Sequence, residues 1–197
     1  MIAMRVFAWS LAVALLLSVP VRVQAGTYDW SIGAYAGKYY DTEPAGFIQG
    51  NAGFAEQYLL ALNGSKTLWR SESWPVTLEL DAMVGVQGGK ASLGEIAVAP
   101  AVRWSGFPWN HVVHTSVSAA PLGISYTTSV SPLELGKDGQ GSRVLNWLFL
   151  EVALSSPTQK SNEFFVRLHH RCAIYDMLNN YGANGEDFFT VGFRRRF

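Results

Sequence analysis

The stretch FFVRLHHRCAIYD, residues 164–176, places two adjacent histidines, His169 and His170, close to the only cysteine of the chain, Cys172. Imidazole is the commonest general base in enzymes, and a thiolate is a strong nucleophile. The His-x-Cys spacing therefore fits the base and the nucleophile of an acyl transfer. Because a single cysteine has no partner for an internal disulfide, three interpretations stay open: an inert buried thiol, an intermolecular link and a reactive group.

The N-terminus has the pattern of a secretory signal peptide. Arg5 precedes the apolar run Val6–Val19, and small residues before Gly26 suit cleavage. We therefore expect residues 1–25 to be removed on export and residues 26–197 to form one domain. No later stretch is long and apolar enough to predict a transmembrane helix.

The mature chain is nearly neutral. Removal of Arg5 and Arg22 with the leader leaves 13 basic and 15 acidic side chains, a net charge of about −2. A nucleic-acid-binding domain usually carries a basic patch, so this composition argues against that class.

Apolar residues in the mature chain recur with a period of two. In VTLELDAMVGV, residues 76–86, the side chains at even positions are all apolar, whereas those at odd positions are mostly polar or small. A β-strand with this pattern has one apolar face and one polar face. The alternation predicts eight strands, near residues 27–37, 52–63, 75–87, 94–105, 110–126, 142–154, 162–172 and 186–197.

Turn-forming stretches separate the predicted strands. They include NGSK at 63–66, GGKASLG at 88–94 and LGKDGQG at 135–141. Because eight is an even number, both ends of the strand series are expected on the same side.

Eight alternating strands fit two architectures: a soluble sandwich or lipocalin-like barrel with apolar side chains inside, and an outer-membrane barrel with apolar side chains outside. Three features favour the membrane barrel: export, strands of about ten residues, and the terminal aromatic Phe197. Aromatic residues near strand ends suit the interfacial girdles of such a barrel; they are Tyr28, Trp30, Trp69, Trp104, Trp109 and Trp147. We therefore predict an all-β, eight-stranded antiparallel transmembrane β-barrel.

Strand parity decides which way the reactive residues point. With both termini in the periplasm, the seventh strand carries His170 and Cys172 towards the extracellular end, on its apolar and lipid-facing side. His169 falls on the opposite side of that strand. On the eighth strand, Asp187 shares the lipid-facing parity. The arginine run at 194–196 lies near the periplasmic boundary, where snorkelling is the ordinary explanation.

His170, Cys172 and Asp187 are therefore expected to converge on the outer wall, because the two strands are consecutive and antiparallel. Polar groups in such a place are functional candidates. A thiol, an imidazole and a carboxylate form the nucleophile, base and orienter of acyl transfer. A metal site is disfavoured, because His169 and His170 point to opposite faces.

Residues 168–197, LHHRCAIYDMLNNYGANGEDFFTVGFRRRF, resemble the C-terminal hairpin of the lipid A 3-O-deacylase family (PagL type), with its acyloxyacyl hydrolase-like relatives. The resemblance implies an outer-membrane barrel of a Gram-negative bacterium that removes an ester-linked acyl chain from lipid A without metal or cofactor. It implies that His170 is the general base, that Asp187 orients it and that Asn184 supports the oxyanion. Cys172 stands where the family has its serine nucleophile.

The departures from the family pattern define the alternatives. A cysteine nucleophile is chemically competent beside an imidazole, but it also fits a non-catalytic outer-membrane barrel with a structural or lipid-binding role. Glu186 competes with Asp187 for the acid role, and parity favours Asp187. The sequence leaves open which acyl position is cleaved, whether the substrate is lipid A or a phospholipid, and whether the barrel forms a homodimer.

Overall fold

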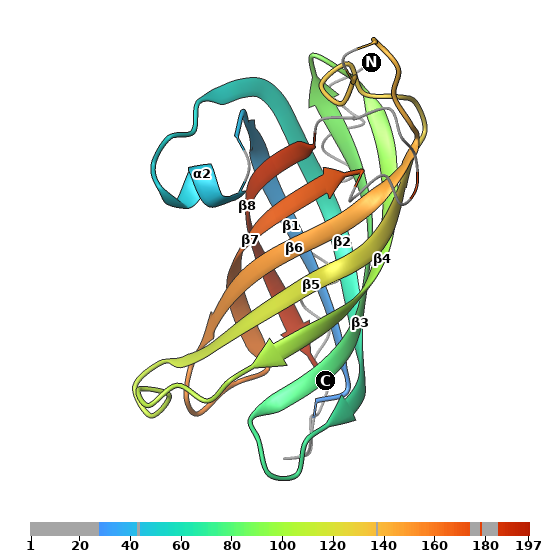
Figure 1. The fold of residues 1–197 in the computed structure, drawn as a ribbon. Helices are drawn as coiled ribbons and strands as arrows, with labels where there is room; N and C mark the ends of the chain where they lie inside the picture. Colours follow the sequence, from blue (N-terminus) through green and yellow to red (C-terminus); the bar gives the residue numbers. More distant parts are fainter. Residues whose placement is uncertain (1–27, 43, 137, 174–177, 179–184) are drawn as a thin grey trace, which may run out of the picture.

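The computed structural model describes residues 28–42, 44–136, 138–173, 178 and 185–197, so the predicted signal peptide lies outside the described residues. Within this part of the chain, eight antiparallel strands form a closed barrel (Figure 1). The strands are β1 (Trp30–Tyr40), β2 (Phe54–Arg70), β3 (Val76–Gly89), β4 (Leu93–Trp104), β5 (His114–Thr127), β6 (Val144–Ser155), β7 (Asn162–Cys172) and β8 (Glu186–Arg196). The predicted all-β, eight-stranded antiparallel barrel is confirmed.

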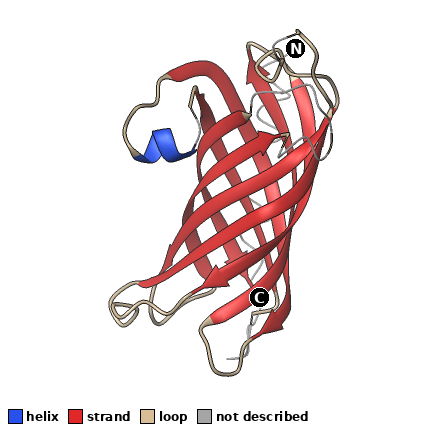
Figure 2. Ribbon diagram, viewed as in Figure 1, coloured by secondary structure: helices blue, strands red, loops and turns tan. Residues whose placement is uncertain are grey.

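One short helix, α2 (Pro44–Ile48), lies in the connection between β1 and β2 and sits outside the barrel wall (Figure 2). The described part of the chain contains no helix of the length and apolarity that a membrane crossing requires.

Both ends of the strand series lie at one end of the barrel. The backbones of Trp30 and Phe197 exchange two hydrogen bonds, each of 2.9 Å. We call this the termini end, and the opposite end, where β7 ends, β8 begins and α2 lies, the hairpin end (Figure 1). The even number of strands produces this arrangement, because each strand reverses the direction of the one before it.

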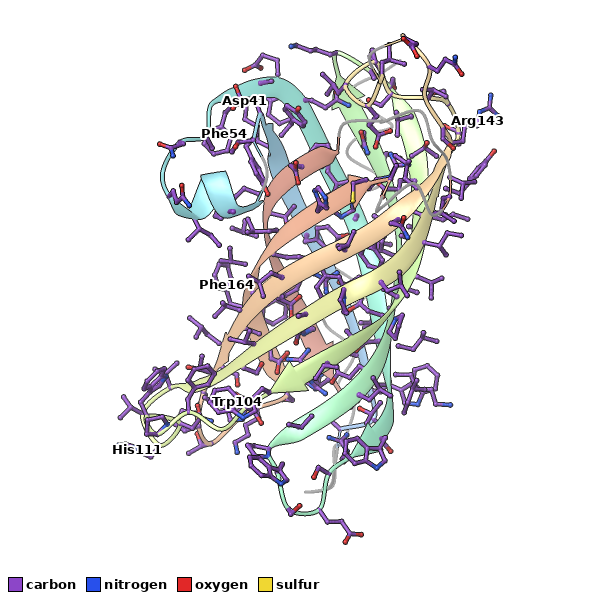
Figure 3. The ribbon with its side chains drawn as sticks, in the orientation of Figure 1. Asp41, Phe54, Trp104, His111, Arg143 and Phe164 are labelled. Carbon is purple, nitrogen blue, oxygen red and sulfur yellow. The ribbon has the colours of Figure 1, made fainter. Side chains whose placement is uncertain are left out.

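The outer wall of the barrel is apolar and the lumen is polar. Along β3, outward Leu80 and Val84 are exposed, whereas inward Glu79 and Asp81 are buried. Phe164 projects from the middle of the wall (Figure 3). Strand side chains alternate between the two faces, so one repeating pattern builds both surfaces. An apolar exterior around a polar interior is the arrangement of a barrel in lipid.

Ion pairs between neighbouring and distant strands fill the lumen. Arg167 lies 3.0 Å from Asp81 and 2.8 Å from Glu151, and Arg194 lies 2.6 Å from Glu163. Arg196 lies 2.7 Å from Glu79. Arg194 and Arg196 are both buried in the lumen, so the prediction that this run snorkels at the membrane boundary is wrong for these two residues. Paired charges satisfy one another where water is scarce, which explains how a barrel can bury them.

Exposed aromatic side chains gather at the termini end. Trp104, Phe107 and Trp109 pack in series, with ring centroids 4.5 and 4.8 Å apart. Trp147 does not belong to this group, because it is fully buried in the lumen, where its indole N–H donates to His169 Nδ1 at 3.2 Å. The expectation that Trp147 lies in a girdle is therefore wrong.

The structure also corrects one predicted turn. NGSK at 63–66 lies inside β2, and the chain reverses instead at residues 71–75. Inward Ser65 shares a hydrogen bond of 2.7 Å with Ser31, and outward Lys66 lies 4.9 Å from the Trp30 ring. Because the lumen accepts small polar side chains, these turn-type residues continue the strand pattern.

Candidate active site on the outer wall

The alternation along β7 separates the two adjacent histidines. His169 and Arg171 point into the lumen and are completely buried, whereas His170 and Cys172 are partly exposed on the outer wall. His169 contacts Glu95 through Nε2 at 3.2 Å, so it belongs to the polar filling of the barrel. The pair in the sequence is therefore two unrelated side chains in space.

The β7–β8 register places His170 directly opposite Asp187. His170 Nδ1 and Asp187 Oδ1 form a hydrogen bond, and Asp187 is only 4% exposed. A carboxylate on Nδ1 fixes the ring orientation and leaves Nε2 to act on another group.

Cys172 lies on the same outward face as His170, two residues further along β7. The Cys172 thiol lies near enough to the His170 imidazole to act on it electrostatically, as the Asp187 carboxylate also does. Since Asp187 occupies Nδ1, Nε2 is the nitrogen that remains for the thiol. The structure thus brings together the three side chains that the sequence singled out, in the order thiol, imidazole, carboxylate.

The end of the β7–β8 connection packs against the imidazole. A Cβ added to Gly185 would lie 2.6 Å from His170 Cε1 and 2.7 Å from the Arg171 carbonyl oxygen. Both distances are below any tolerable contact, so this position requires glycine. The sequence pattern gave no reason to single out Gly185, because its role depends on the fold of the connection.

Asn146 is a second residue that the sequence did not point to. It faces outward on β6, directly opposite Cys172 in the β6–β7 register, and is 3% exposed. Its side-chain amide donates to the Gly123 carbonyl at 3.4 Å. Side chains in this cross-strand position lie about 5 Å apart at Cβ, so the carboxamide borders the thiol. A polar residue among the apolar outward residues of β6 was the sequence feature that could have identified Asn146.

An apolar hollow adjoins the imidazole on the side away from Asp187. Its volume is about 210 Å³. It is lined by Ala119, Ala120, Pro121, Leu148, Phe149, Leu150, Leu168 and His170. Because Pro121 has no backbone N–H, it interrupts the ladder between β5 and β6, whose register shifts between Ala120 and Gly123. The irregular strand contributes one side of the hollow.

The side chains of two residues that the sequence singled out, Asn184 and Glu186, are not described by the structure. Asn184 lies outside the described residues. Glu186 pairs with Arg171 in the β7–β8 register, and its side chain also lies outside the described part of the chain.

The described residues contain no group of three or more His, Cys, Asp or Glu side chains arranged to hold a metal ion. The chemistry that the site can perform with its own groups is nucleophilic attack by Cys172, proton transfer through His170 and orientation of that imidazole by Asp187.

Comparisons with known proteins bear on the fold. No protein-family profile matches the chain, and no curated protein matches it. The solved structures that share its fold include the outer membrane enzyme PagL, with a TM-score of 0.55, 16% identity, and coverage of 85% of this chain and 99% of that chain. They also include Neisserial surface protein A, with a TM-score of 0.50, 10% identity, and coverage of 85% and 97%. The chain therefore has the fold of the outer-membrane β-barrels.

Proposed function

We propose that this protein is an outer-membrane acyl ester hydrolase that removes an ester-linked acyl chain from lipid A, as in the lipid A 3-O-deacylase (PagL) family. The observation that carries the proposal is the His170–Asp187 hydrogen bond on the outer wall, with Cys172 next to the imidazole on the same face of β7. The polar group of an ester in the outer leaflet would meet this wall at the level of the site.

The location of His170 and Asp187 on the outer wall favours a functional role for them over a structural one. Polar and ionisable side chains on a lipid-facing wall reduce stability, and they are commonly retained for a purpose. The lumen of this barrel already holds many paired charges, so a structural ion pair has an environment available inside. His170 and Asp187 instead face outward, and the partly exposed imidazole is the member of the pair that a lipid could meet.

The reaction begins with transfer of the Cys172 proton to His170 Nε2. The thiolate attacks the ester carbonyl carbon, and Asp187 stabilises the imidazolium that forms. His170 then protonates the departing alcohol oxygen, which leaves a thioester on Cys172. Water, deprotonated by His170, attacks the thioester, and the thiol regains its proton as the fatty acid leaves. No cofactor enters these steps.

The apolar hollow supplies a place for the first carbons of the acyl chain. It adjoins His170, and its lining side chains are apolar apart from the imidazole. A chain lying there would bring its carbonyl end towards the imidazole and the thiol. Because the acyl chain already lies in hydrocarbon, the hollow would hold it by close van der Waals contact and not by the hydrophobic effect.

Export by the leader, residues 1–25, and insertion in the outer membrane of a Gram-negative bacterium are part of the proposal. The hairpin end would face the outer leaflet, because the site lies towards that end, and both termini would face the periplasm.

Comparison of lipid A from cells that express the protein and from cells that lack it tests the proposal. Mass spectrometry should show loss of one ester-linked acyl chain in the expressing cells, and free fatty acid in the same extract. An unchanged acyl pattern at high levels of folded protein in the outer membrane would reject the function.

A non-catalytic barrel with a structural or lipid-binding role is the second candidate. The cysteine at the position of the family's serine favours it, because sulfur is larger than oxygen and a site shaped for a hydroxyl need not work with a thiol. Binding of lipid A without release of an acyl chain would support this candidate.

A further inference from the structure

We propose that Tyr40 is a positioning residue of the site: its phenol holds the Asp187 carboxylate on the side away from His170, and α2 covers this pair. The inference rests on the proposed function, because it concerns the orientation of the same imidazole and thiol. Tyr40 would act through Asp187 and would not touch the substrate.

The register between β1 and β8 brings the two side chains together. Tyr39 pairs with Phe188, and their inward-facing rings meet edge to face with centroids 6.0 Å apart. The next residue on each antiparallel strand is Tyr40 on β1 and Asp187 on β8. Since strand side chains alternate, both point outward from neighbouring positions.

Burial distinguishes this pair from the surrounding wall. Tyr40 is 0% exposed and Asp187 is 4% exposed, although both face outward. Phe47 of α2 provides the cover: its ring centroid lies 4.6 Å from that of Tyr40 and 5.0 Å from that of Phe189, on which it stacks. The helix outside the barrel therefore closes one flank of the site (Figure 1).

A buried carboxylate requires hydrogen-bond donors. His170 supplies one at Oδ1. The Tyr40 hydroxyl is buried and has no partner of strict hydrogen-bond geometry among the described residues, whereas the Asp187 carboxylate acts on it both as a charge and as an acceptor. A small rotation of the phenol completes the bond, because a tyrosine hydroxyl donates readily to an ionised carboxylate.

The consequence is a row of four side chains along the outer wall: Tyr40, Asp187, His170 and Cys172. A carboxylate held from two sides keeps one orientation, and it then holds the imidazole in one orientation. The hollow borders His170 on the other flank, so the row separates the covered carboxylate side from the open lipid side.

The test uses the full-length protein in vesicles that contain lipid A and phospholipid, with Tyr40→Phe as the variant and Tyr126→Phe as the matched control. Tyr126 is also an outward-facing tyrosine, but it lies on β5 and is exposed. One readout is acyl release, as kcat and KM. The other is the rate of Cys172 alkylation by iodoacetamide, which reports on the thiol and imidazole without any substrate.

Loss of one hydrogen bond to a charged group should lower kcat about tenfold, with KM unchanged, and should slow alkylation by a similar factor. Tyr126→Phe should match the wild type in both. In a protein that already carries Asp187→Asn, Tyr40→Phe should have little further effect, because the group on which it acts has lost its charge.

Wild-type rates for Tyr40→Phe would overturn the inference, as would a full additional loss in the Asp187→Asn background. If the wild type releases no acyl chain, the proposed function fails, and the alkylation rates still decide the role of Tyr40. Tyr40→Phe would then be supported as a loss of positioning if it slows alkylation in the otherwise wild-type protein but not in the protein that carries Asp187→Asn. An unchanged alkylation rate for Tyr40→Phe would reject the inference.

Discussion

The contact between His170 and Asp187 is a polar feature of a lipid-facing wall, and its environment explains why we assign it a function. The parity of β7 and β8 was sufficient to predict that both side chains and Cys172 face outward. Asn146 and Gly185 were beyond such reasoning, because their relation to the site depends on the β6–β7 register and on the path of a connection. Spacing within a strand can be read from sequence, whereas contacts between strands require the register.

Substitution of the base should abolish most of the activity. His170→Asn removes the proton acceptor of Cys172 and should lower kcat by at least about a hundredfold, the usual contribution of a general base. The measurement is the initial rate of acyl release from lipid A in vesicles. His111→Asn, at an exposed position of the β4–β5 connection, should retain the wild-type rate. A fully active His170→Asn would contradict the assigned role.

Removal of the Asn146 carboxamide should slow the reaction without unfolding the barrel. Asn146→Ala takes away a polar group beside the thiol, and loss of one donor near a developing oxyanion should lower kcat about tenfold or more. Asn162→Ala is the control, because Asn162 faces outward on β7 at the opposite end of that strand from Cys172. Equal rates for both variants would show that Asn146 serves only the β5–β6 contact.

At the scale of the elements, the strand pattern predicted all eight strands, and the exceptions have physical reasons. NGSK is a turn sequence in most surroundings, but a polar lumen accepts Asn63 and Ser65 as inward strand residues. Helix α2 was not predicted, because five residues are too few to show a helical period. The register shift near Pro121 affects the candidate site, because Pro121 lines the hollow beside His170.

A bulky residue in the hollow should change the response to acyl-chain length. Ala119→Phe reduces the space beside His170 and should raise KM for long-chain substrates about tenfold, with a smaller effect on short chains, because a long chain loses more van der Waals contacts with the hollow. The comparison uses synthetic esters of increasing chain length in mixed micelles. Ala36→Phe, on the outer face of β1, introduces the same ring elsewhere on the wall and should not change the length dependence. The same change in the chain-length dependence of KM for both variants would argue against the hollow as the acyl site.

At the scale of the whole molecule, the barrel presents apolar side chains to its surroundings and packs ion pairs inside. The alternating pattern alone fitted a lipocalin-like barrel as well as a membrane barrel, and the faces of the strands separate the two: Leu80 and Val84 face outward, and Glu79 faces inward. The lumen network could not be predicted in detail, because its pairs join residues far apart in sequence, such as Asp81 and Arg167.

Disruption of the lumen network should destabilise the barrel. Arg167→Met leaves Asp81 and Glu151 without a cation that contacts both, and a broken buried pair costs about 3–5 kcal/mol. The free energy of unfolding in urea, measured in vesicles, would report this loss. Arg143→Met, at an exposed rim position, should change it by less than about 0.5 kcal/mol. Equal stability of the two variants would mean that the network contributes little.

The most direct test of the central claim is acyl release from lipid A by the purified barrel in vesicles, compared between the wild type and Cys172→Ala. The mechanism predicts free fatty acid and a lipid A shortened by one ester-linked chain with the wild type, and neither product with Cys172→Ala, although that variant folds and inserts normally. Equal release by both proteins would contradict Cys172 as the nucleophile, and no release by either would contradict the hydrolase function.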